Sequence, residues 1–172
     1  MFPVPKHLKD ILRPTGNKNH ELEVIGQIMC TCGSDSFKIK YVGDDEQFKN
    51  VVCHIQIAES FYLIFNADCI SCKRDYLIFD AHLHGWDGYG SRAYWAEKEK
   101  PPGKLLLCRK CNPDIFSMSL EINSRGQEDF ISEGGPEYEK VDWVEAFEWI
   151  RITTHCKNCN TTTKEWIDCE TM

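Results

Sequence analysis

Four short cysteine pairs constrain this chain more than any other feature. They are Cys30-Thr-Cys32, Cys69-Ile-Ser-Cys72, Cys108-Arg-Lys-Cys111 and Cys156-Lys-Asn-Cys159. Two thiolates two or three positions apart on a tight turn can bind one metal ion, and two such turns facing each other complete a closed tetrahedral site. The pairs use eight of the ten cysteines. The sequence therefore predicts two metal sites.

The order of the pairs along the chain predicts that neighbouring pairs share an ion. The expected ligand sets are Cys30, Cys32, Cys69 and Cys72 for one ion, and Cys108, Cys111, Cys156 and Cys159 for the other. In the alternative grouping, the two central pairs share an ion. The first pair is tighter than the others, and if it supplies only one thiolate, the substitute ligand comes from Cys53, His54 or His20.

Two zinc ions are the expected cofactors, because four-thiolate tetrahedral sites are typical of structural zinc. Iron is the alternative, since the same ligands suit a rubredoxin-type ion or an iron–sulfur cluster. With four thiolates bound, the ion has no open coordination position. Lewis-acid chemistry and activation of a bound water are therefore not expected at either site.

Composition limits the partners and the compartment. The net charge is -7, which disfavours nucleic acid as a partner because nucleic-acid binding depends on Lys and Arg neutralising phosphates. Residues 1–8 contain no apolar segment of the signal-peptide type, and no stretch of the sequence has the length and apolarity of a membrane span. We expect a cytoplasmic protein, in which closely spaced cysteines indicate metal binding, and Cys169 is expected to be an unpaired thiol.

The chain predicts a mainly β fold with one short N-terminal helix, at residues 3–13. Runs of β-branched and aromatic residues bounded by turn residues indicate the strands. These expected strands cover residues 21–29, 37–42, 51–57, 61–67, 74–81, 104–107, 116–122, 129–132 and 163–168. Asp142-Trp-Val-Glu145 matches a capping box, so residues 142–148 form either a short helix or the entry to a strand that ends at Thr154.

The sequence also predicts an internal repeat, because the order pair, strands, pair, strand occurs twice. Cys32-Gly-Ser-Asp-Ser-Phe37 matches Cys111-Asn-Pro-Asp-Ile-Phe116 in spacing, and Phe79-Asp80 resembles Ile167-Asp168. The expected division of the chain is an N-terminal helix and lead-in (1–20), a first unit (21–81), a connecting loop (82–103) and a second unit (104–172).

The cysteine pairs and their flanking strands resemble the knuckles of zinc-ribbon and rubredoxin-like domains. In that group, two β-hairpin knuckles build each site and the metal is usually structural. The resemblance implies two zinc-ribbon-like units in tandem. It also implies a departure at Cys30-Thr-Cys32, since the common knuckle has two residues between its cysteines.

From these patterns we expect a non-catalytic zinc scaffold that acts as a protein-interaction module. One candidate contact surface is the acidic stretch at residues 128–148. The other is the aromatic connection with Trp86, Tyr89, Tyr94 and Trp95. That second surface requires the aromatic side chains to be exposed rather than packed into the core.

Two alternative functions make different demands. A nucleic-acid-associated zinc ribbon requires basic residues gathered on one face near the first site, and the candidates are Lys38, Lys40, Lys73 and Arg74. A small enzyme or ligand-binding protein would use the glycine-rich segment that contains His82, His84 and Asp87. That hypothesis requires the two histidines to converge on one ligand or metal ion.

Overall fold

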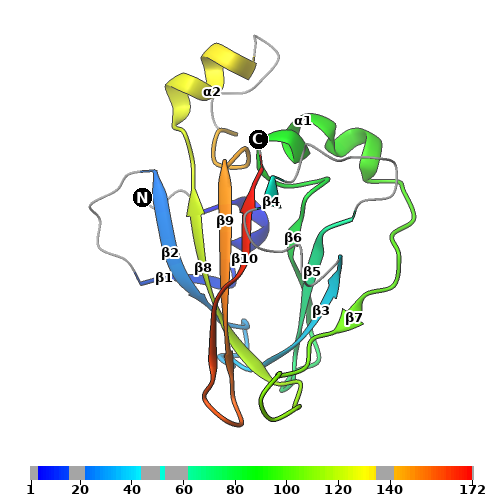
Figure 1. Ribbon diagram of the computed structural model, residues 1–172. Coiled ribbons are helices and arrows are strands. Elements are labelled where there is room, and N and C mark those ends of the chain that lie inside the picture. The colour runs from blue at the N-terminus through cyan, green and yellow to red at the C-terminus, as the bar shows by residue number, and fades with distance from the viewer. Residues whose placement is uncertain (1–3, 16–21, 44–50, 53–61, 135–141, 172) are drawn as a thin grey trace.

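The computed structural model describes residues 4–15, 22–43, 51–52, 62–134 and 142–171, and within these ranges the chain is mainly β (Figure 1). The prediction of a mainly β fold is confirmed. The strands are β1 (Leu12–Pro14), β2 (Glu23–Ile28), β3 (Phe37–Val42), β4 (Val51–Val52), β5 (Ile64–Cys69), β6 (Asp75–Asp80), β7 (Lys104–Leu105), β8 (Phe116–Asn123), β9 (Trp149–Cys156) and β10 (Thr162–Glu170).

These strands form one branched sheet whose main path runs β4-β10-β9-β8-β3-β5-β6. β9 pairs along the whole of one edge of β8. The other edge is divided between β2, where Val24 pairs with Ile122, and β3, where Phe37 pairs with Phe116. β7 in turn pairs with β3. Strands from the segments 21–81 and 104–172 therefore share the same sheet.

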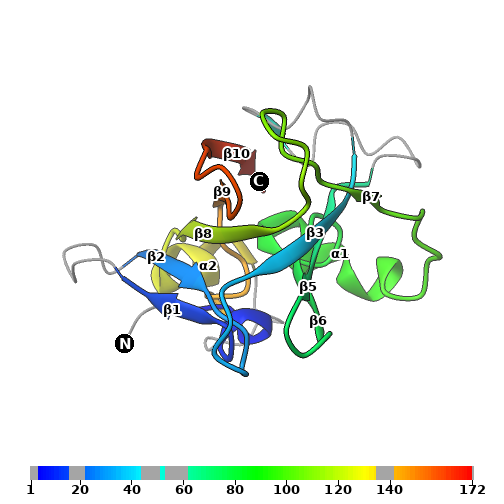
Figure 2. The same ribbon diagram turned by 90° about the horizontal axis from the view of Figure 1, so that it is seen from below.

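The sheet branches at β8 and curves, so that β9 and β10 on one side face β3 and β5 on the other side across the core (Figure 2). Burial alternates along the strands, as in β9, where every second residue is buried, so each strand presents one apolar face to the interior. Trp166 of β10 meets Tyr41 of β3 and Phe65 of β5, with ring centroids 5.6 Å and 5.4 Å away. These ring contacts join β10 to β3 and β5 across the core.

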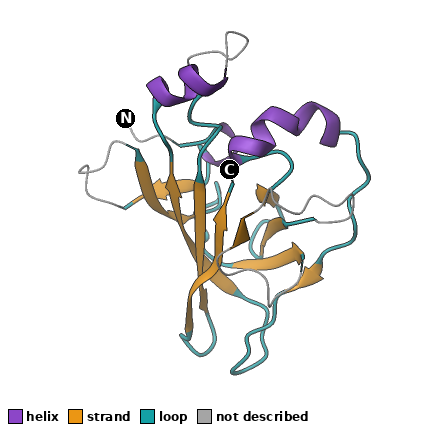
Figure 3. Ribbon diagram, turned by 45° about the horizontal axis from the view of Figure 1, so that its top comes forward, coloured by secondary structure: helices purple, strands orange, loops and turns teal. Residues whose placement is uncertain are grey.

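Two hairpins in the sheet, β5–β6 and β9–β10, have matching registers. Phe65 pairs with Phe79 in the first, and Ile152 pairs with Ile167 in the second. Each hairpin also contains an irregularity where the register shifts. The four cysteine turns lie at one end of the molecule and the two helices at the other (Figure 3).

The segment 82–103, which we expected to be a connecting loop, contains the helix α1 (Gly85–Trp95). Its glycines give it low intrinsic helix propensity. The helix forms nevertheless because it packs closely against other segments, and that close packing requires glycine at two positions. A Cβ on Gly88 would lie 2.8 Å from the backbone carbon of Leu83. Gly85 has φ +77° and lies against Thr171, so a larger residue fits neither position.

Two other helix and strand predictions are wrong, and a third segment is settled between its alternatives. The expected N-terminal helix is a single 3-10 turn, η1 (Lys6–Leu8), followed by β1. Residues 129–132, expected as a strand, lie in the helix α2 (Gln127–Gly134), which buries Phe130. Of the two alternatives for residues 142–148, the structure shows the entry to a strand, because the segment leads through turns into β9 and contains no helix. Within the described ranges, neither helix has the length and apolarity needed to span a bilayer.

Candidate metal centres

The first cysteine cluster joins the turn between β2 and β3 to the turn between β5 and β6. Its members are Cys30, Cys32, Cys69 and Cys72. The Sγ atoms of Cys30 and Cys72 are 3.4 Å apart, and those of Cys32 and Cys69 are 3.7 Å apart. Cys30 and Cys69 are buried, whereas Cys32 and Cys72 are exposed. The cluster therefore lies at the surface with one side toward the core.

The second cluster joins the turn before β8 to the turn between β9 and β10. Its members are Cys108, Cys111, Cys156 and Cys159. The Sγ atoms of Cys108 and Cys159 are 3.7 Å apart, and those of Cys111 and Cys156 are 3.5 Å apart. The structure thus brings the cysteines together in the sequential grouping, with neighbouring pairs facing each other.

Both clusters have the dimensions of a four-thiolate metal site. With a Zn–S distance of about 2.3 Å, a tetrahedron separates its sulfur atoms by about 3.8 Å, and the measured separations of 3.4–3.7 Å are close to that value. In each cluster all the ligand atoms lie within 4.8 Å of one another. The donor set and its spacing fit zinc or iron, and they suit a closed site without an open coordination position.

All four turns end in the same backbone conformation. The residue after the second cysteine has a positive φ in every case: +88° for Gly33, 62° for Lys73, 67° for Asn112 and 56° for Asn160. Sequence reasoning anticipated this only at Gly33. The other three positions could have been found from the sequence, because each also follows the second cysteine of a pair. Two of them are asparagine, which tolerates the left-handed region better than most residues.

A shorter turn accommodates the tight Cys30-Thr-Cys32 spacing. The N–H of Gly33 donates to the carbonyl of Cys30, three residues back, whereas the N–H of Asn112 donates to the carbonyl of Cys108, four residues back. Both cysteines of the first pair consequently reach the cluster, and no substitute is needed. The substitutes considered from the sequence, Cys53, His54 and His20, lie outside the described residues.

The surroundings lower the pKa of some cluster thiols and raise the pKa of others. Burial opposes ionisation of Cys30, but the backbone N–H of Cys32 and the hydroxyl of Tyr76 outweigh it and lower the pKa of Cys30 to about 6. The hydroxyl of Thr161, 3.1 Å from the sulfur of Cys159, is the main reason why the pKa of Cys159 falls to about 6. The backbone N–H of Ser34 favours the thiolate of Cys32, but the neighbouring thiol of Cys30 and burial outweigh it and raise the pKa of Cys32 to about 12. Burial, followed by the neighbouring thiol of Cys159, raises the pKa of Cys111 to about 12. A divalent cation would replace these retained protons.

Cys169 is fully buried and disulfide-bonded, which corrects the expectation of an unpaired thiol. Its position in β10 is far along the strand from the cysteine turn at Cys159, so it does not belong to the second cluster. Disulfides are uncommon in the cytoplasm. The disulfide therefore does not support the expected cytoplasmic location, which stays a prediction.

The histidines of the glycine-rich segment do not converge. His84 stacks on His7 with ring centroids 3.7 Å apart, while His82 is buried beside Asp80 with its ring tilted against that of Trp95. Asp87 lies in the first turn of α1. Among the described residues, the groups that could hold a metal ion are the two cysteine clusters alone. The arrangement required for an enzyme centred on these histidines is therefore not present there.

The aromatic connection is also mostly packed. Tyr89 is buried and Trp86 packs against Phe130 beneath α2. Trp95 is half-buried against His82. Tyr94, at 61% exposure, is the clear exception. This finding counts against the connection as an interaction surface.

The basic residues near the first cluster are already engaged. Lys38 pairs with Asp114, and Lys40 pairs with Asp68. Lys73 donates to the carbonyl of Ile70, and Arg74 donates to the hydroxyl of Thr31. The free cationic face that a nucleic-acid-binding ribbon requires does not form from these four side chains.

The chain was compared with protein-family models, with curated proteins and with solved structures, and none of the three comparisons found a match.

Proposed function

We propose that this chain is a non-catalytic zinc scaffold in which two structural ions hold a protein-interaction module together. The observation that carries the proposal is the pair of closed four-cysteine clusters. They join turns that are far apart in the sequence and lie together at one end of the sheet. An ion held by four thiolates links those turns without offering a coordination position to a substrate.

The same proposal includes two related, zinc-ribbon-like units. It is supported by the matching hairpin registers, in which Phe79 and Ile167 occupy equivalent positions, and by the common turn geometry. The amide N–H of Ile70 donates to the carbonyl of Ser36, and that of Lys157 donates to the carbonyl of Ile115. These donors follow the first cysteine of the second and the fourth pair by one residue. The acceptors follow the second cysteine of the first and the third pair by four residues.

In this proposal the two units exchange strands. The strand before the first cysteine pair, β2, pairs with β8, which follows the third pair. The strand before the third pair, β7, pairs with β3, which follows the first pair. Phe37 and Phe116, matched in the expected repeat, pair with each other where β3 meets β8. A twofold relation between the units accounts for this reciprocal pattern.

The test is the metal content of protein purified without added metal, measured by elemental analysis and native mass spectrometry. We expect two zinc ions in the wild-type chain and one in each of the variants Cys72→Ser and Cys159→Ser. Ser71→Ala, next to a ligand but without a thiol, serves as the control and keeps both ions. A metal-free but folded protein would refute the scaffold, and stoichiometric iron would replace it with a redox function.

A further inference from the structure

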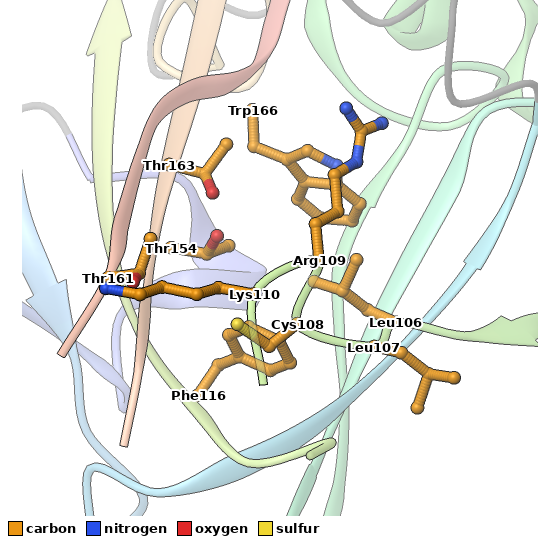
Figure 4. A pocket seen from close by; sticks show the side chains of 10 residues that line it. All are labelled: Leu106, Leu107, Cys108, Arg109, Lys110, Phe116, Thr154, Thr161, Thr163 and Trp166. Carbon is orange, nitrogen blue, oxygen red and sulfur yellow. The ribbon is translucent and has the colours of Figure 1, made fainter. Parts of the chain in front are cut away.

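A pocket of about 540 Å³ lies beside the second cysteine cluster (Figure 4). One wall is the segment Leu106–Lys110, and the opposite wall is the β9–β10 hairpin with Thr154, Thr161 and Thr163. The rings of Trp166 and Phe116 also line it. Its volume falls within the range of about 300–1,000 Å³ that is usual for ligand sites.

The equivalent gap in the first half is closed by two long side chains. The hydroxyl of Tyr76, on β6, lies 3.1 Å from the sulfur of Cys30 and 3.2 Å from the hydroxyl of Thr31. Arg74 also donates to Thr31. Counted from the hairpin cysteines, the residues that correspond to Arg74 and Tyr76 are Thr161, just before β10, and Thr163, within it. Threonine is too short to cross the gap, so the second half has a pocket where the first half has an inserted tyrosine.

The open pocket combines aromatic surface, hydroxyl groups and positive charge. Arg109 and Lys110 form no ion pair with any described residue, in a chain whose net charge is -7. Lys110 extends across the pocket toward Thr161, and Arg109 lies at the end near Trp166 (Figure 4). A flat apolar group with carboxylates beside it would match this lining in both shape and charge.

The strand that borders the pocket favours a peptide over a small molecule. On the side away from β9, β10 pairs only through Cys169 and Glu170 with β4 within the described chain. The part of β10 from Thr162 to Asp168 has no described strand beside it on that side. Unpaired backbone groups at a strand edge can bind an extended peptide, whose side chains then enter neighbouring pockets.

We propose that this pocket is the docking site for a partner protein's extended segment, in which an aromatic side chain enters the pocket and flanking carboxylates pair with Arg109 and Lys110. The inference rests on the proposed function, since it assigns the contact surface of the interaction module. The inserted aromatic ring takes the place that Tyr76 takes in the first half.

The test uses the zinc-loaded, ¹⁵N-labelled chain and three blocked peptides: acetyl-Glu-Gly-Tyr-Gly-Glu-amide and its counterparts with Lys at both Glu positions or Ala at the Tyr position. In an extended strand, residues two positions apart point to the same side, so both carboxylates lie on the side of the ring. The readout is the indole N–H resonance of Trp166, assigned with Trp166→Phe. We expect saturable shifts with the acidic tyrosine peptide. We expect about tenfold weaker binding for each counterpart, because each loses either the ion pairs or the ring.

The variant Thr163→Tyr gives the sharpest control, since it supplies in the second half the residue that closes the first. It should abolish peptide binding while the chain keeps two zinc ions. Thr162→Tyr places the same ring on the other face of the hairpin, where Thr162 lines a different pocket, and it should bind the peptide as the wild type does.

Three outcomes would overturn the docking proposal: equal binding of all three peptides, binding that survives Thr163→Tyr, or tighter binding of free 4-hydroxyphenylacetate than of the acidic peptide. The last result would assign the pocket to a small aromatic anion. Failure of the docking site is distinguishable from failure of the scaffold, because the zinc content of the same samples reports on the scaffold alone.

Discussion

The two cysteine clusters reach nearly the same sulfur geometry from different sequences. The first contains a pair with a single intervening residue, Thr31, and the second contains Arg109 and Lys110 at the equivalent place. Nevertheless, the closest sulfur contacts between facing pairs, two in each cluster, lie between 3.4 and 3.7 Å. The turn absorbs the missing residue by closing its hydrogen bond one residue earlier and ending in a glycine. The comparison teaches that the left-handed residue after the pair, rather than the spacer length, is common to all four turns.

Removing one buried thiolate from each cluster tests whether the two sites are energetically equivalent. Cys69→Ser and Cys156→Ser should each lower the free energy of unfolding by more than 5 kcal/mol, because structural zinc sites contribute on the order of 10 kcal/mol to folding. Denaturant unfolding followed by circular dichroism measures the effect, with Ser117→Ala as a control close to the second cluster. A large loss for one variant and a small loss for the other would show that only one site supports the fold.

Acid should weaken the region around β6, because the stacked pair His7 and His84 packs against Ile78 and Phe79 of that strand. Burial lowers the pKa of His7 to about 4 and that of His84 to about 2, well below the value of about 6.5 in an unfolded chain. The unfolded state therefore takes up protons first as the pH falls below 6.5. Stability is complete above that pH and declines below it, by about 2 kcal/mol per histidine at pH 5.

The measurement is the free energy of unfolding at pH 7 and pH 5 for wild type, His84→Phe and His155→Phe. His84→Phe should lose part of the pH dependence that remains after any effect of metal release common to all three proteins. His155→Phe should keep it, because the ring of His155 lies near the surface against the hydroxyl of Thr162, away from the His7–His84 pair. Identical pH dependence in all three would contradict the assignment.

Changes at the left-handed turn positions sharpen the comparison at smaller scale. A Cβ on Gly33 would meet no atom within 4 Å, so the cost of Gly33→Ala comes from its φ of +88° alone and should be about 1 kcal/mol. Lys73→Gly and Asn112→Gly relieve the same strain and should be neutral or slightly stabilising. Thermal unfolding of the zinc-loaded proteins distinguishes these signs. Destabilisation by Gly at position 73 or 112 would mean that the side chain, not the backbone, sets the turn.

Two ion pairs link the turn regions of the two halves and should have the smallest effect. Lys157 reaches both carboxylate oxygens of Asp35 at 2.8 and 2.9 Å, and Lys38 contacts Asp114 at 2.6 Å. Both pairs are partly exposed, so Lys157→Ala and Lys38→Ala should each cost about 0.5 kcal/mol and less at high salt. A double-mutant cycle for each pair measures the coupling, and coupling above 2 kcal/mol would contradict this ranking.

The sequence was sufficient where local chemistry determines the structure. The alternating apolar runs place β3 at Phe37–Val42 and β8 at Phe116–Asn123, within one residue of the predicted bounds. The cysteine spacing predicts the four metal-binding turns, whereas the sequential grouping shown by the clusters was favoured over a grouping in which the two central pairs share an ion. Both predictions depend on residues close together in the chain, whose side-chain period or turn geometry allows few alternatives.

Sequence reasoning failed where distant contacts override local preference. The helix α1 forms despite three glycines because Gly85 and Gly88 allow close approach to Thr171 and Leu83. The pairing of β2 with β8 and of β7 with β3 leaves no local signature. The pocket beside the second cluster was missed for the same reason, since it depends on Thr163 being short where its counterpart Tyr76 is long. Whether residues 21–81 and 104–172 are separate units stays a prediction.

The exchanged strands have a consequence for synthesis on the ribosome. Glu23 pairs with Asn123, so β2 keeps one edge without its partner until about a hundred more residues have emerged. The first four-cysteine cluster, by contrast, has all its thiols once Cys72 is available. Early zinc binding would hold the β2–β3 and β5–β6 turns together during that interval, when an unpaired strand edge is most exposed to aggregation. The ion would then act as a folding clamp before β8 completes the sheet.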